Sequence, residues 1–428
     1  MSAGQAEQIA VLVLGSGGRE HALCWKLAQS PLLSKLWCAP GNPGTEQVAE
    51  NVALDPCDPI AVVDFCRRHA VGLVVVGPEA PLVAGVSDAL VAAGIPCFGP
   101  SAEAARIEGS KAFAKEIMQA AGVPTAAAQT FSDPQAAQEE ARRLGRVVVK
   151  ADGLAAGKGV IVATDPDEAA DAVRQLSGLG AAGTRLVLEE VLEGEEVSVI
   201  ALCDGAHHVL LPTSQDHKRV GEGDRGPNTG GMGAVSPVPF LDAEGLSLVQ
   251  RQVIVPTLQE LARRGTPFRG ALYVGVMVTA DGPKVLEFNA RFGDPEAQVL
   301  LLRLSSDLLP VLLACAMGAL PPETMLEAHP GFAAGVVLAA EGYPEAPKKG
   351  AVIRGLDDAQ PDQGAVFLAG VGAQGGALVT TGGRVLTVCA RGATLEAARQ
   401  SAYEAAGAIR FDGMQLRRDI GWRVLRAS

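Results

Sequence analysis

The chain has 428 residues, which is enough for about three domains of roughly 150 residues each. Hydrophobic residues make up 48% and charged residues 20%, which is typical of a globular protein with a sizeable core rather than of a disordered chain. The net charge of −12 argues against binding to a nucleic-acid backbone, because such proteins usually carry a basic surface, but it allows small phosphorylated substrates.

The first hundred residues alternate short apolar runs with amphipathic segments. Strands are expected at residues 9–14, 35–39, 72–77 and 96–98. Helices are expected at residues 21–29, 60–69 and 82–93. Such alternation predicts βαβ units and a doubly wound parallel sheet. Glycine and proline turns follow three of the strands, and they should gather at the carboxyl edge of the sheet, where ligands of such sheets bind.

The first of these turns contains Gly17, Gly18, Arg19 and Glu20 and opens a helix. Such a turn presents free backbone N–H groups and the positive end of the helix dipole to an anion. A dinucleotide-binding GxGxxG motif would need glycine at position 20, so that interpretation fails. A phosphate site, with Arg19 as a charged donor, and a purely structural turn are the two interpretations that stay open.

A single helix is expected at residues 103–121, followed by a lysine- and glycine-rich hairpin. Its strands, 147–149 and 159–163, are joined directly through glycines. The spacing GxxxGKG differs from a P-loop, which needs GxxxxGK before Ser or Thr and a helix after it. A lysine-bearing strand, a glycine flap and a return strand favour a lid over a triphosphate, with Lys150 and Lys158 as charges. An ordinary solvated hairpin is the alternative, which the apolar strands disfavour.

Residues 188–198 are acidic and on chemistry alone would pass for the edge of a strand. If a nucleotide binds here, Glu189, Val191 and Glu196 are the candidates to meet adenine and the ribose hydroxyls. The segment 219–237 is rich in glycine and proline without periodicity, which predicts a long functional loop. That loop and the residues before it carry enough hydrogen-bond donors and acceptors to contact a substrate, and the loop is expected to close over it.

A second hairpin is expected at residues 272–279 and 284–288, around an Asp-Gly turn. Alternation places Glu287, Asn289 and Arg291 on one face of its second strand, with Leu286 and other apolar residues on the opposite face. Carboxylate and amide oxygens suit Mg²⁺, and Arg291 would neutralise a transferring phosphoryl group or a forming oxyanion. A surface strand carrying an ion pair is the alternative.

A separate small α+β domain is expected from about residue 331. Its strands should lie at residues 333–339, 365–369, 377–380 and 384–389, before a helix at 395–409. The eight scattered cysteines indicate reduced thiols, as in a cytoplasmic protein. The longest apolar run, 308–320, is shorter than the ~20 residues of a membrane span. We expect a cytoplasmic location and no membrane partner.

The chain resembles the ATP-grasp superfamily in the order of four elements: a lysine-bearing strand, a glycine flap, an acidic strand and a Glu-x-Asn strand. Nine motifs narrow the resemblance to the phosphoribosylamine–glycine ligase family: GGREHAL (17–23), APGNPGT (39–45), VGPEAPL (76–82), EGSKAF (108–113), KADGLAAGKGV (150–160), SQDHKR (214–219), GPNTGGMGA (226–234), RFGDPE (291–296) and RRDIGW (417–422). The resemblance covers nearly the whole chain. It implies an N-terminal substrate domain at 1–108, an ATP-grasp domain at 109–330 with its flap at about 124–196, and a C-terminal α+β domain at 331–428.

The resemblance also implies a set of site residues. Phosphoribosylamine would be held by Gly17, Gly18, Arg19, Glu20, Pro78 and Glu79. ATP would be held by Lys111, Lys150, Gly157, Lys158, Gly159, Glu189, Val191 and Glu196. The metal, Mg²⁺ or Mn²⁺, would be held by Glu287 and Asn289. Glycine would lie near Arg291 and Asp294, with the loop of Asp216 and Lys218 closing over it.

The implied reaction converts ATP and glycine to glycyl phosphate, which the amine of phosphoribosylamine then attacks. The products are glycinamide ribonucleotide, ADP and phosphate, as in purine biosynthesis, and no covalent enzyme nucleophile is needed. We expect a monomer with small-molecule substrates and transient contacts with neighbouring enzymes of the pathway. The rival interpretations are another ATP-grasp ligase or carboxylase, a nicotinamide-dependent oxidoreductase built on the first glycine turn, and a non-catalytic nucleotide sensor.

Overall fold

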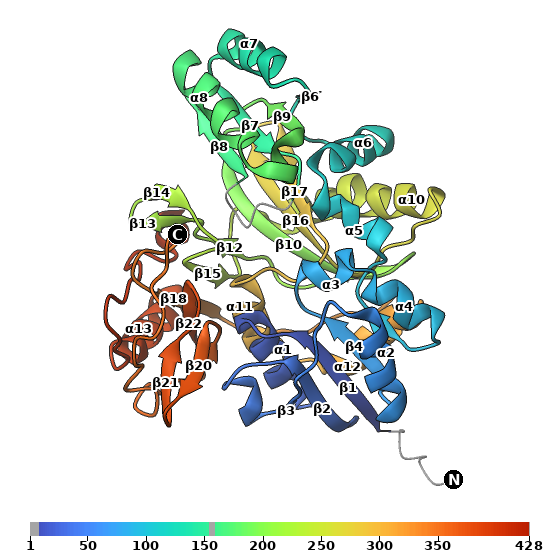
Figure 1. Cartoon of the computed structure of the whole chain (residues 1–428), viewed down its shortest axis with the longest axis vertical. Helices are drawn as coiled ribbons and strands as arrows, with labels where there is room; N and C mark the ends of the chain where they lie inside the picture. The colour runs from blue at the N-terminus through green and yellow to red at the C-terminus, as the bar shows by residue number, and fades with distance from the viewer. Residues whose placement is uncertain (1–7, 154–158, 428) are drawn as a thin grey trace.

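The computed structural model describes residues 8–153 and 159–427. Its N-terminal part is built on a parallel sheet. Its order is β3-β2-β1-β4-β5, with bounds Glu50–Asn51, Leu33–Pro40, Ile9–Gly15, Leu73–Val76 and Cys97–Phe98. The helices of this part are α1 (Gly18–Leu27), α2 (Pro59–Arg68), α3 (Glu79–Val83), α4 (Val86–Ala92) and α5 (Ala102–Gly109). This confirms the predicted parallel α/β fold (Figure 1).

Two expected single helices are each divided in two, so those predictions were wrong. Residues 82–93 contain the end of α3 and all of α4, separated at Gly85, whose φ of +79° lies in the left-handed region. Residues 103–121 contain most of α5 and all of α6 (Lys111–Ala121), separated at Ser110. The Ser110 hydroxyl accepts a hydrogen bond from the Phe113 N–H at 3.1 Å, so it begins a new helix as a cap.

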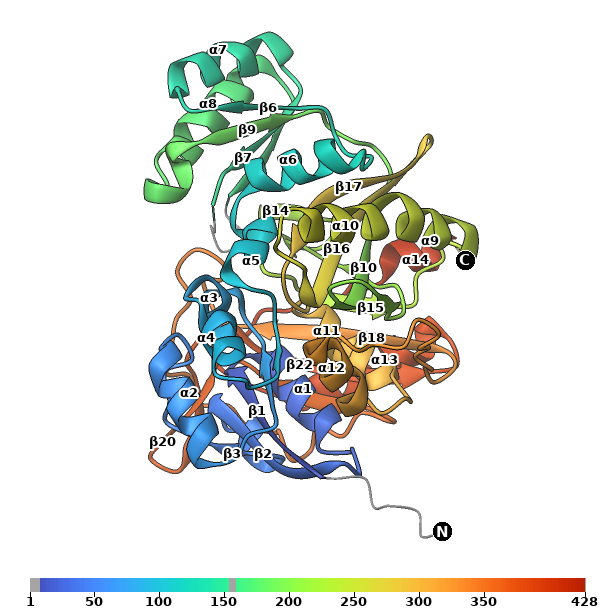
Figure 2. The same ribbon diagram turned by 90° about the vertical axis from the view of Figure 1, so that its right-hand side faces the viewer.

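The centre of the molecule is a four-stranded antiparallel sheet in the order β11-β10-β16-β17. The bounds are His208–Leu210, Glu195–Asp204, Arg269–Thr279 and Gly282–Asn289. A second antiparallel sheet, β6-β9-β7-β8, has bounds Ala128–Phe131, Leu186–Glu189, Val147–Ala151 and Val160–Ala163. With α7 (Pro134–Leu144) and α8 (Pro166–Ser177) it forms the flap subdomain at the top of Figures 1 and 2. Both predicted hairpins, β7–β8 and β16–β17, are confirmed.

The C-terminal sheet is shared between two distant parts of the chain. Its order is β12-β15-β18-β22-β19, with bounds Gln215–Asp216, Gly233–Ser236, Phe332–Ala339, Arg384–Gly392 and Ala365–Leu368. The hairpin β20–β21 (Val371–Gln374, Ala377–Thr380) and α13 (Leu395–Ala406) belong to the same part of the chain. The expectation of one long loop at 219–237 was wrong, because the segment forms a hairpin of β13 (Arg219–Gly221) and β14 (Arg225–Asn228) and then β15.

One buried helix, α11 (Glu296–Arg303), joins the parts, because it packs against α1 and against β15, β18 and β22. The other helices are α9 (Ala243–Val249), α10 (Val255–Arg263), α12 (Leu309–Met317) and α14 (Trp422–Ala427). Short irregular turns of helix span Thr45–Gln47, Gly180–Thr184 and Gln250–Ile254. All eight cysteines are free thiols. Among the helices of residues 8–153 and 159–427, none has the length and hydropathy to cross a membrane.

Candidate active site

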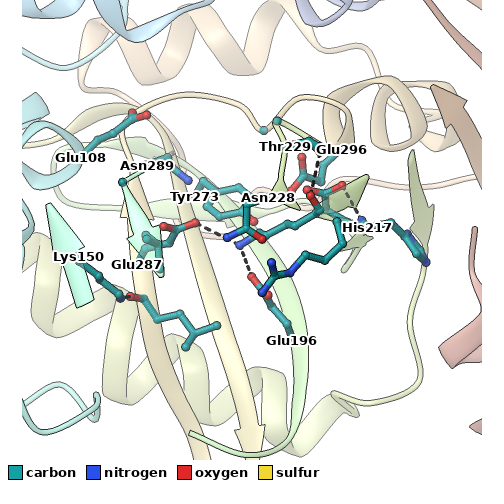
Figure 3. Close-up of a pocket in the computed structure, with 18 of the residues that line it drawn as sticks. Glu108, Lys150, Glu196, His217, Asn228, Thr229, Tyr273, Glu287, Asn289 and Glu296 are labelled. Carbon is teal, nitrogen blue, oxygen red and sulfur yellow. Dashed lines mark hydrogen bonds and ion pairs between the residues drawn. The ribbon is translucent and has the colours of Figure 1, made fainter. Parts of the chain in front are cut away.

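A cavity of about 870 Å³ lies where the flap, the central sheet, the N-terminal domain and the C-terminal sheet meet (Figure 3). Most of the predicted site residues line it: Arg19, Pro78, Glu79, Lys111, Lys150, Gly159, Glu189, Val191, Glu196, Asp216, Lys218, Glu287, Asn289, Arg291 and Asp294. Gly17, Gly18 and Glu20, which the structure describes, do not line it. Gly157 and Lys158 lie outside the described residues. Segments far apart in the sequence therefore converge on one site large enough for a small-molecule ligand.

Under the flap, two lysines share one buried carboxylate. The Nζ of Lys150 on β7 lies 2.9 Å from Glu189 Oε2, and the Nζ of Lys115 on α6 lies 3.3 Å from Glu189 Oε1. Lys150 also donates to the main-chain oxygen of Leu286 at 2.9 Å. Burial lowers the pKa of Lys115, although the charge of Glu189 opposes this effect. Glu189 therefore holds Lys150 against the edge of the central sheet, which the sequence did not reveal.

The contact between Lys150 and Leu286 depends on an irregularity in β17. The pairing of β16 with β17 shifts register between Gly275 and Val276, opposite Leu286. Such a β-bulge re-aims side chains and main-chain groups. Leu286 consequently lines the cavity together with Glu287, so the strict alternation expected for this strand was wrong at that residue.

Lys218 bridges two carboxylates of the central sheet, Glu196 on β10 and Glu287 on β17, with β16 between these strands. Its Nζ lies 2.5 Å from Glu196 Oε1 and 3.3 Å from Glu287 Oε1, and Lys111 Nζ lies 3.8 Å from Glu287 Oε2. The positive charge of Lys218 lowers the pKa of Glu287, and Lys111 and Lys150 add to this effect against the opposing effect of burial. Burial disfavours the charged form of Lys218, but Glu196 and Glu287 together raise its pKa well above the usual value. Lys218 and Glu287 are therefore both ionised at neutral pH.

Glu287 and Asn289 have the chemistry of a site for a hard divalent cation. Both line the cavity from the end of β17, and Figure 3 shows them beside one another. The charges around Glu287 keep its carboxylate ionised, and an amide oxygen is a second suitable ligand. No group of three His, Cys, Asp or Glu side chains within the described part of the chain has the arrangement of a metal centre. Glu287 and Asn289 fit a cation that also takes oxygens from a phosphorylated substrate.

Arg291 is held from both sides by carboxylates of the N-terminal part. Its Nη2 lies 2.9 Å from Glu108 Oε1, and its Nε lies 3.6 Å from Glu79 Oε2. Glu108 also accepts a hydrogen bond from the Ala290 N–H at 2.7 Å, so it fixes the main chain as well as the side chain. Burial opposes ionisation of Glu79, but the charge of Arg291 and hydrogen bonds hold its pKa below the usual value. The guanidinium is thus oriented at the cavity wall.

The first glycine turn is organised by Glu20 rather than left open. The Glu20 carboxylate accepts from the Gly17 N–H at 2.6 Å and from Arg19 Nε at 2.6 Å, and it is 2% exposed. A Cβ at Gly77 would lie 2.1 Å from Glu20 Oε1, so glycine is needed for the two turns to meet. Arg19 Nη1 donates to the Phe292 main-chain oxygen at 3.1 Å. Arg19 is the member of this turn that reaches the cavity.

Two acidic side chains lie on the cavity wall near the C-terminal sheet. Burial raises the pKa of Asp216 well above its usual value, and the charge of Glu296 adds to this. Glu296 is 3% exposed, and its Oε1 accepts from Ser198 Oγ at 3.1 Å; that hydroxyl lies 2.8 Å from the Tyr273 hydroxyl. Glu296, Ser198 and Tyr273 form a buried polar cluster that was not predicted from the sequence, whereas Asp216 was a predicted site residue.

The C-terminal part of the chain also contributes to the site, through Arg384 at the start of β22 and Tyr343 in the turn after β18. Arg384 Nη1 donates to the main-chain oxygens of Gly230 at 2.5 Å and Asp294 at 2.6 Å. Burial opposes ionisation of Asp294, but Arg384 and Arg19 hold its pKa below the usual value. The Gly230 N–H donates to the Tyr343 hydroxyl at 2.9 Å. Sequence analysis missed Arg384 and Tyr343 because neither lies in a recognised motif.

Two further residues of the site, Glu108 and Glu296, did carry a signal that sequence analysis left unused. Glu108 begins the motif EGSKAF, and Glu296 ends the motif RFGDPE. Both line the cavity, where Glu108 pairs with Arg291 and Glu296 accepts from Ser198. Their place at the ends of recognised motifs could therefore have identified them as members of the site.

Three features together define an enzyme of the ATP-grasp class. They are a flap hairpin that bears a lysine, a central antiparallel sheet that ends in Glu-x-Asn, and the lysine–glutamate clusters between them. Solved structures agree with this fold. A phosphoribosylamine–glycine ligase from Thermotoga maritima has a TM-score of 0.83 at 35% identity, covering 96% of this chain and 100% of that one. The biotin carboxylase domain of Hydrogenobacter thermophilus 2-oxoglutarate carboxylase, with a TM-score of 0.71 at 17% identity, covers 96% and 92% and shares the fold.

The chain belongs to the phosphoribosylglycinamide synthetase family. Models of that family match its N domain at residues 9–108, its ATP-grasp (A) domain at 109–297 and its C domain at 333–423. Among curated relatives, the phosphoribosylamine–glycine ligase of Rhizobium meliloti is 51% identical over 97% of this chain and 98% of its own length. That of Caulobacter vibrioides is 51% identical over 98% and 99%. The resemblance seen in the sequence motifs is confirmed.

Proposed function

We propose that this chain joins glycine to phosphoribosylamine through glycyl phosphate and uses ATP with a divalent metal. The overall reaction, an ATP-dependent ligation in purine biosynthesis, follows from family membership over nearly the whole chain. The observation that supports the chemical route is the convergence of Lys111 and Lys218 on Glu287 inside the cavity. Positive charges grouped around a carboxylate suit a site for phosphates and their metal.

The nucleotide would lie between the flap and the central sheet. Its phosphates would meet Lys111 at the start of α6 and four residues predicted for the glycine flap and its strands, Lys150, Gly157, Lys158 and Gly159. Val191 would offer main-chain groups to adenine, and Glu196 would take the ribose hydroxyls. Glu189 would act through Lys150 and Lys115, because its carboxylate already pairs with both. Glu287 and Asn289 would hold Mg²⁺ or Mn²⁺, which neutralises phosphate charge when bound.

The two chemical steps need positioning and charge neutralisation rather than an enzyme nucleophile. A carboxylate oxygen of glycine attacks the γ-phosphorus, the bond to the β–γ bridging oxygen breaks, and ADP leaves. The amine of phosphoribosylamine then attacks the glycyl carbonyl carbon, phosphate leaves, and the amine loses a proton. Arg291 would neutralise the carbonyl oxygen, because Glu108 and Glu79 fix its guanidinium at the cavity wall. Asp294, Asp216 and Lys218 would surround glycine.

Phosphoribosylamine would be held on the N-terminal side of the cavity, by Arg19, Pro78 and Glu79. Gly17, Gly18 and Glu20 would act by shaping the turn that carries Arg19. We also propose the domain division 1–108, 109–330 and 331–428, which the matched family ranges support. A cytoplasmic monomer with transient contacts to neighbouring purine-pathway enzymes stays a prediction.

The test is release of phosphate from ATP by the full chain with a divalent metal. We expect release that requires both glycine and phosphoribosylamine, with glycinamide ribonucleotide formed in equal amount. Replacing glycine by bicarbonate separates the ligase from a carboxylase. Phosphate release that depends on another acid and not on glycine would contradict the proposal.

A further inference from the structure

The C-terminal segment 417–423 contacts the chain on both sides of Lys218. Residue His217 precedes Lys218 and residue Arg219 follows it, and each is bonded to this segment. The segment contains the whole RRDIGW motif, to which the proposed mechanism assigns no task. Figure 1 shows that the chain returns at its C-terminus to the β13–β14 hairpin. The segment thus lies against the element that carries a proposed site residue.

Arg417 is the first point of attachment and is fully buried, with 0% exposure. Its Nη1 donates to the Arg219 main-chain oxygen at 3.0 Å and to Asp224 Oδ1 at 2.8 Å. Its Nε and Nη2 each lie 2.8 Å from an oxygen of Asp419, a two-pronged contact that fixes the plane of the guanidinium. A fully buried arginine is rare unless it is paired in this way. Arg417 therefore holds the chain just after Lys218.

His217 is the second point of attachment and holds the chain just before Lys218. Its Nε2 accepts a hydrogen bond from the Gly421 N–H at 2.9 Å, and its Nδ1 lies 3.2 Å from the Gly233 main-chain oxygen. A neutral ring with its proton on Nδ1 satisfies both contacts. Burial, together with the charge of Arg417, lowers the pKa of His217 to about 4, in agreement with that form.

The hairpin that follows Lys218 is tied to the same segment at its tip. Asp419 Oδ2 accepts from the Gly223 N–H at 2.8 Å. Arg423 donates to Asp224 Oδ2 at 2.9 Å and to Glu195 Oε2 at 3.0 Å. Glu195 is adjacent in β10 to Glu196, the carboxylate that pairs with Lys218. The segment is thus attached both to the lysine's own chain and to the strand of its partner.

We propose that Arg417 is a positioning residue for the nucleotide site: with Asp419, it fixes the main chain around Lys218 so that the ammonium group reaches Glu196 and Glu287. The inference rests on the proposed function, in which Glu196 and Glu287 bind adenosine and metal, and in which Lys218, beside glycine, pairs with both carboxylates. Glu287 on β17 and Glu196 on β10 are held by the central sheet, whereas Lys218 follows a strand of only two residues, β12. The Lys218 main-chain oxygen accepts from Thr229 N–H at 2.7 Å and from Thr229 Oγ1 at 2.8 Å, and the segment 417–423 adds attachments on either side of it.

The experiment compares Arg417→Lys with Asp419→Asn in the full chain. Lysine keeps the charge but cannot form the two-pronged contact, so we expect a KM for ATP raised about tenfold, in line with the usual cost of losing a group that orients a binding residue. Asp419→Asn should raise the KM for ATP by a smaller factor than Arg417→Lys does. The KM for phosphoribosylamine should stay within about twofold, because its proposed binding residues lie outside this network of contacts. Arg418→Ala, at an exposed neighbouring residue, is the matched control and should match the wild type.

A merely structural role for Arg417 would reduce the folded fraction, which lowers kcat but leaves KM unchanged, and that result would overturn the proposal. Direct titration of ATP by calorimetry, without glycine, should show an ATP affinity reduced by the same factor as the KM is raised. If Arg417→Lys does not fold, Asp419→Asn decides the question. A folded variant that binds ATP as tightly as the wild type also overturns the proposal. Wild-type protein without glycine-dependent phosphate release would instead contradict the proposed function itself.

Discussion

Two groups of basic residues line the cavity and are anchored differently: Lys111 and Lys218 form the lysine side, and Arg19, Arg291 and Arg384 form the arginine side. Lys111 and Lys218 are held by carboxylates, which can exchange partners when an anionic ligand enters. Arg19 and Arg291 both donate to the Phe292 main-chain oxygen, and Arg384 donates to two main-chain oxygens. A main-chain oxygen moves only if the chain moves. Under the proposed function, ATP would therefore bind on an adaptable side, and the reacting groups would lie on a fixed side, where main-chain contacts add to the carboxylate pairs of Arg291.

The largest effect is expected at the centre of the lysine side. Glu287→Ala removes the carboxylate that pairs with Lys111 and Lys218 and that would hold the metal, so we expect turnover to fall by at least about a hundredfold with folding intact. Steady-state phosphate release and circular dichroism measure the two quantities. Glu287→Gln keeps the shape without the charge and should be nearly as damaging. Glu244→Ala, at an exposed position of α9, is the control; a Glu287→Ala enzyme as active as this control would contradict the metal assignment.

On the arginine side, Arg291→Lys tests whether turnover needs the fixed, planar guanidinium group of Arg291. Lysine keeps the charge but cannot contact Glu108 and Glu79 with the same planar geometry, so kcat should fall by about ten- to a hundredfold. Arg143→Lys is the matched control and should have wild-type kcat, because that arginine makes a two-pronged contact with Glu140 on the exposed surface of α7. If Arg291→Lys turns over as fast as the wild type, the positive charge alone suffices and the proposed difference between the two sides fails.

The smallest expected effect concerns how the fixed side is attached to the C-terminal part. The Leu368 N–H donates to His21 Nδ1 at 2.9 Å, which needs an unprotonated nitrogen, and burial lowers the pKa of His21 to about 4. Between about pH 4 and the ordinary value of about 6.5 the unfolded chain binds more protons, so the free energy of unfolding decreases as pH falls through this range and is fully retained above it. His21→Asn, whose amide oxygen can accept the same bond, should weaken this dependence.

Urea midpoints at pH 7 and pH 5 measure the effect of His21→Asn. The variant should lose less stability between the two pH values than the wild type does. His69→Asn, at an exposed histidine, is the control and should behave as the wild type. An unchanged pH dependence in His21→Asn would show that protonation of His21 does not weaken the contact with Leu368.

Local patterns predicted a large part of the fold. Apolar runs with glycine turns predicted β7 with β8 and β16 with β17, because a hairpin is specified by residues close in the chain. The helix breaks at Gly85 and Ser110 were missed, since each depends on one residue inside a helical pattern. β12 and β15 were missed because two- and four-residue strands carry too little pattern and gain their stability from pairing with each other and with β18.

By itself, the sequence determined the family, the lysine flap and the identity of the Glu-x-Asn strand, because these depend on residue types at fixed local spacing. Only the tertiary structure decided how the charges are paired. Glu108 is 182 residues from the Ala290 N–H it accepts from, and Arg384 is 90 residues from Asp294. The segment 417–423 contacts both neighbours of Lys218, across separations of 198 residues to Arg219 and 204 residues to His217. Such pairs form when distant elements pack, and no local spacing encodes them.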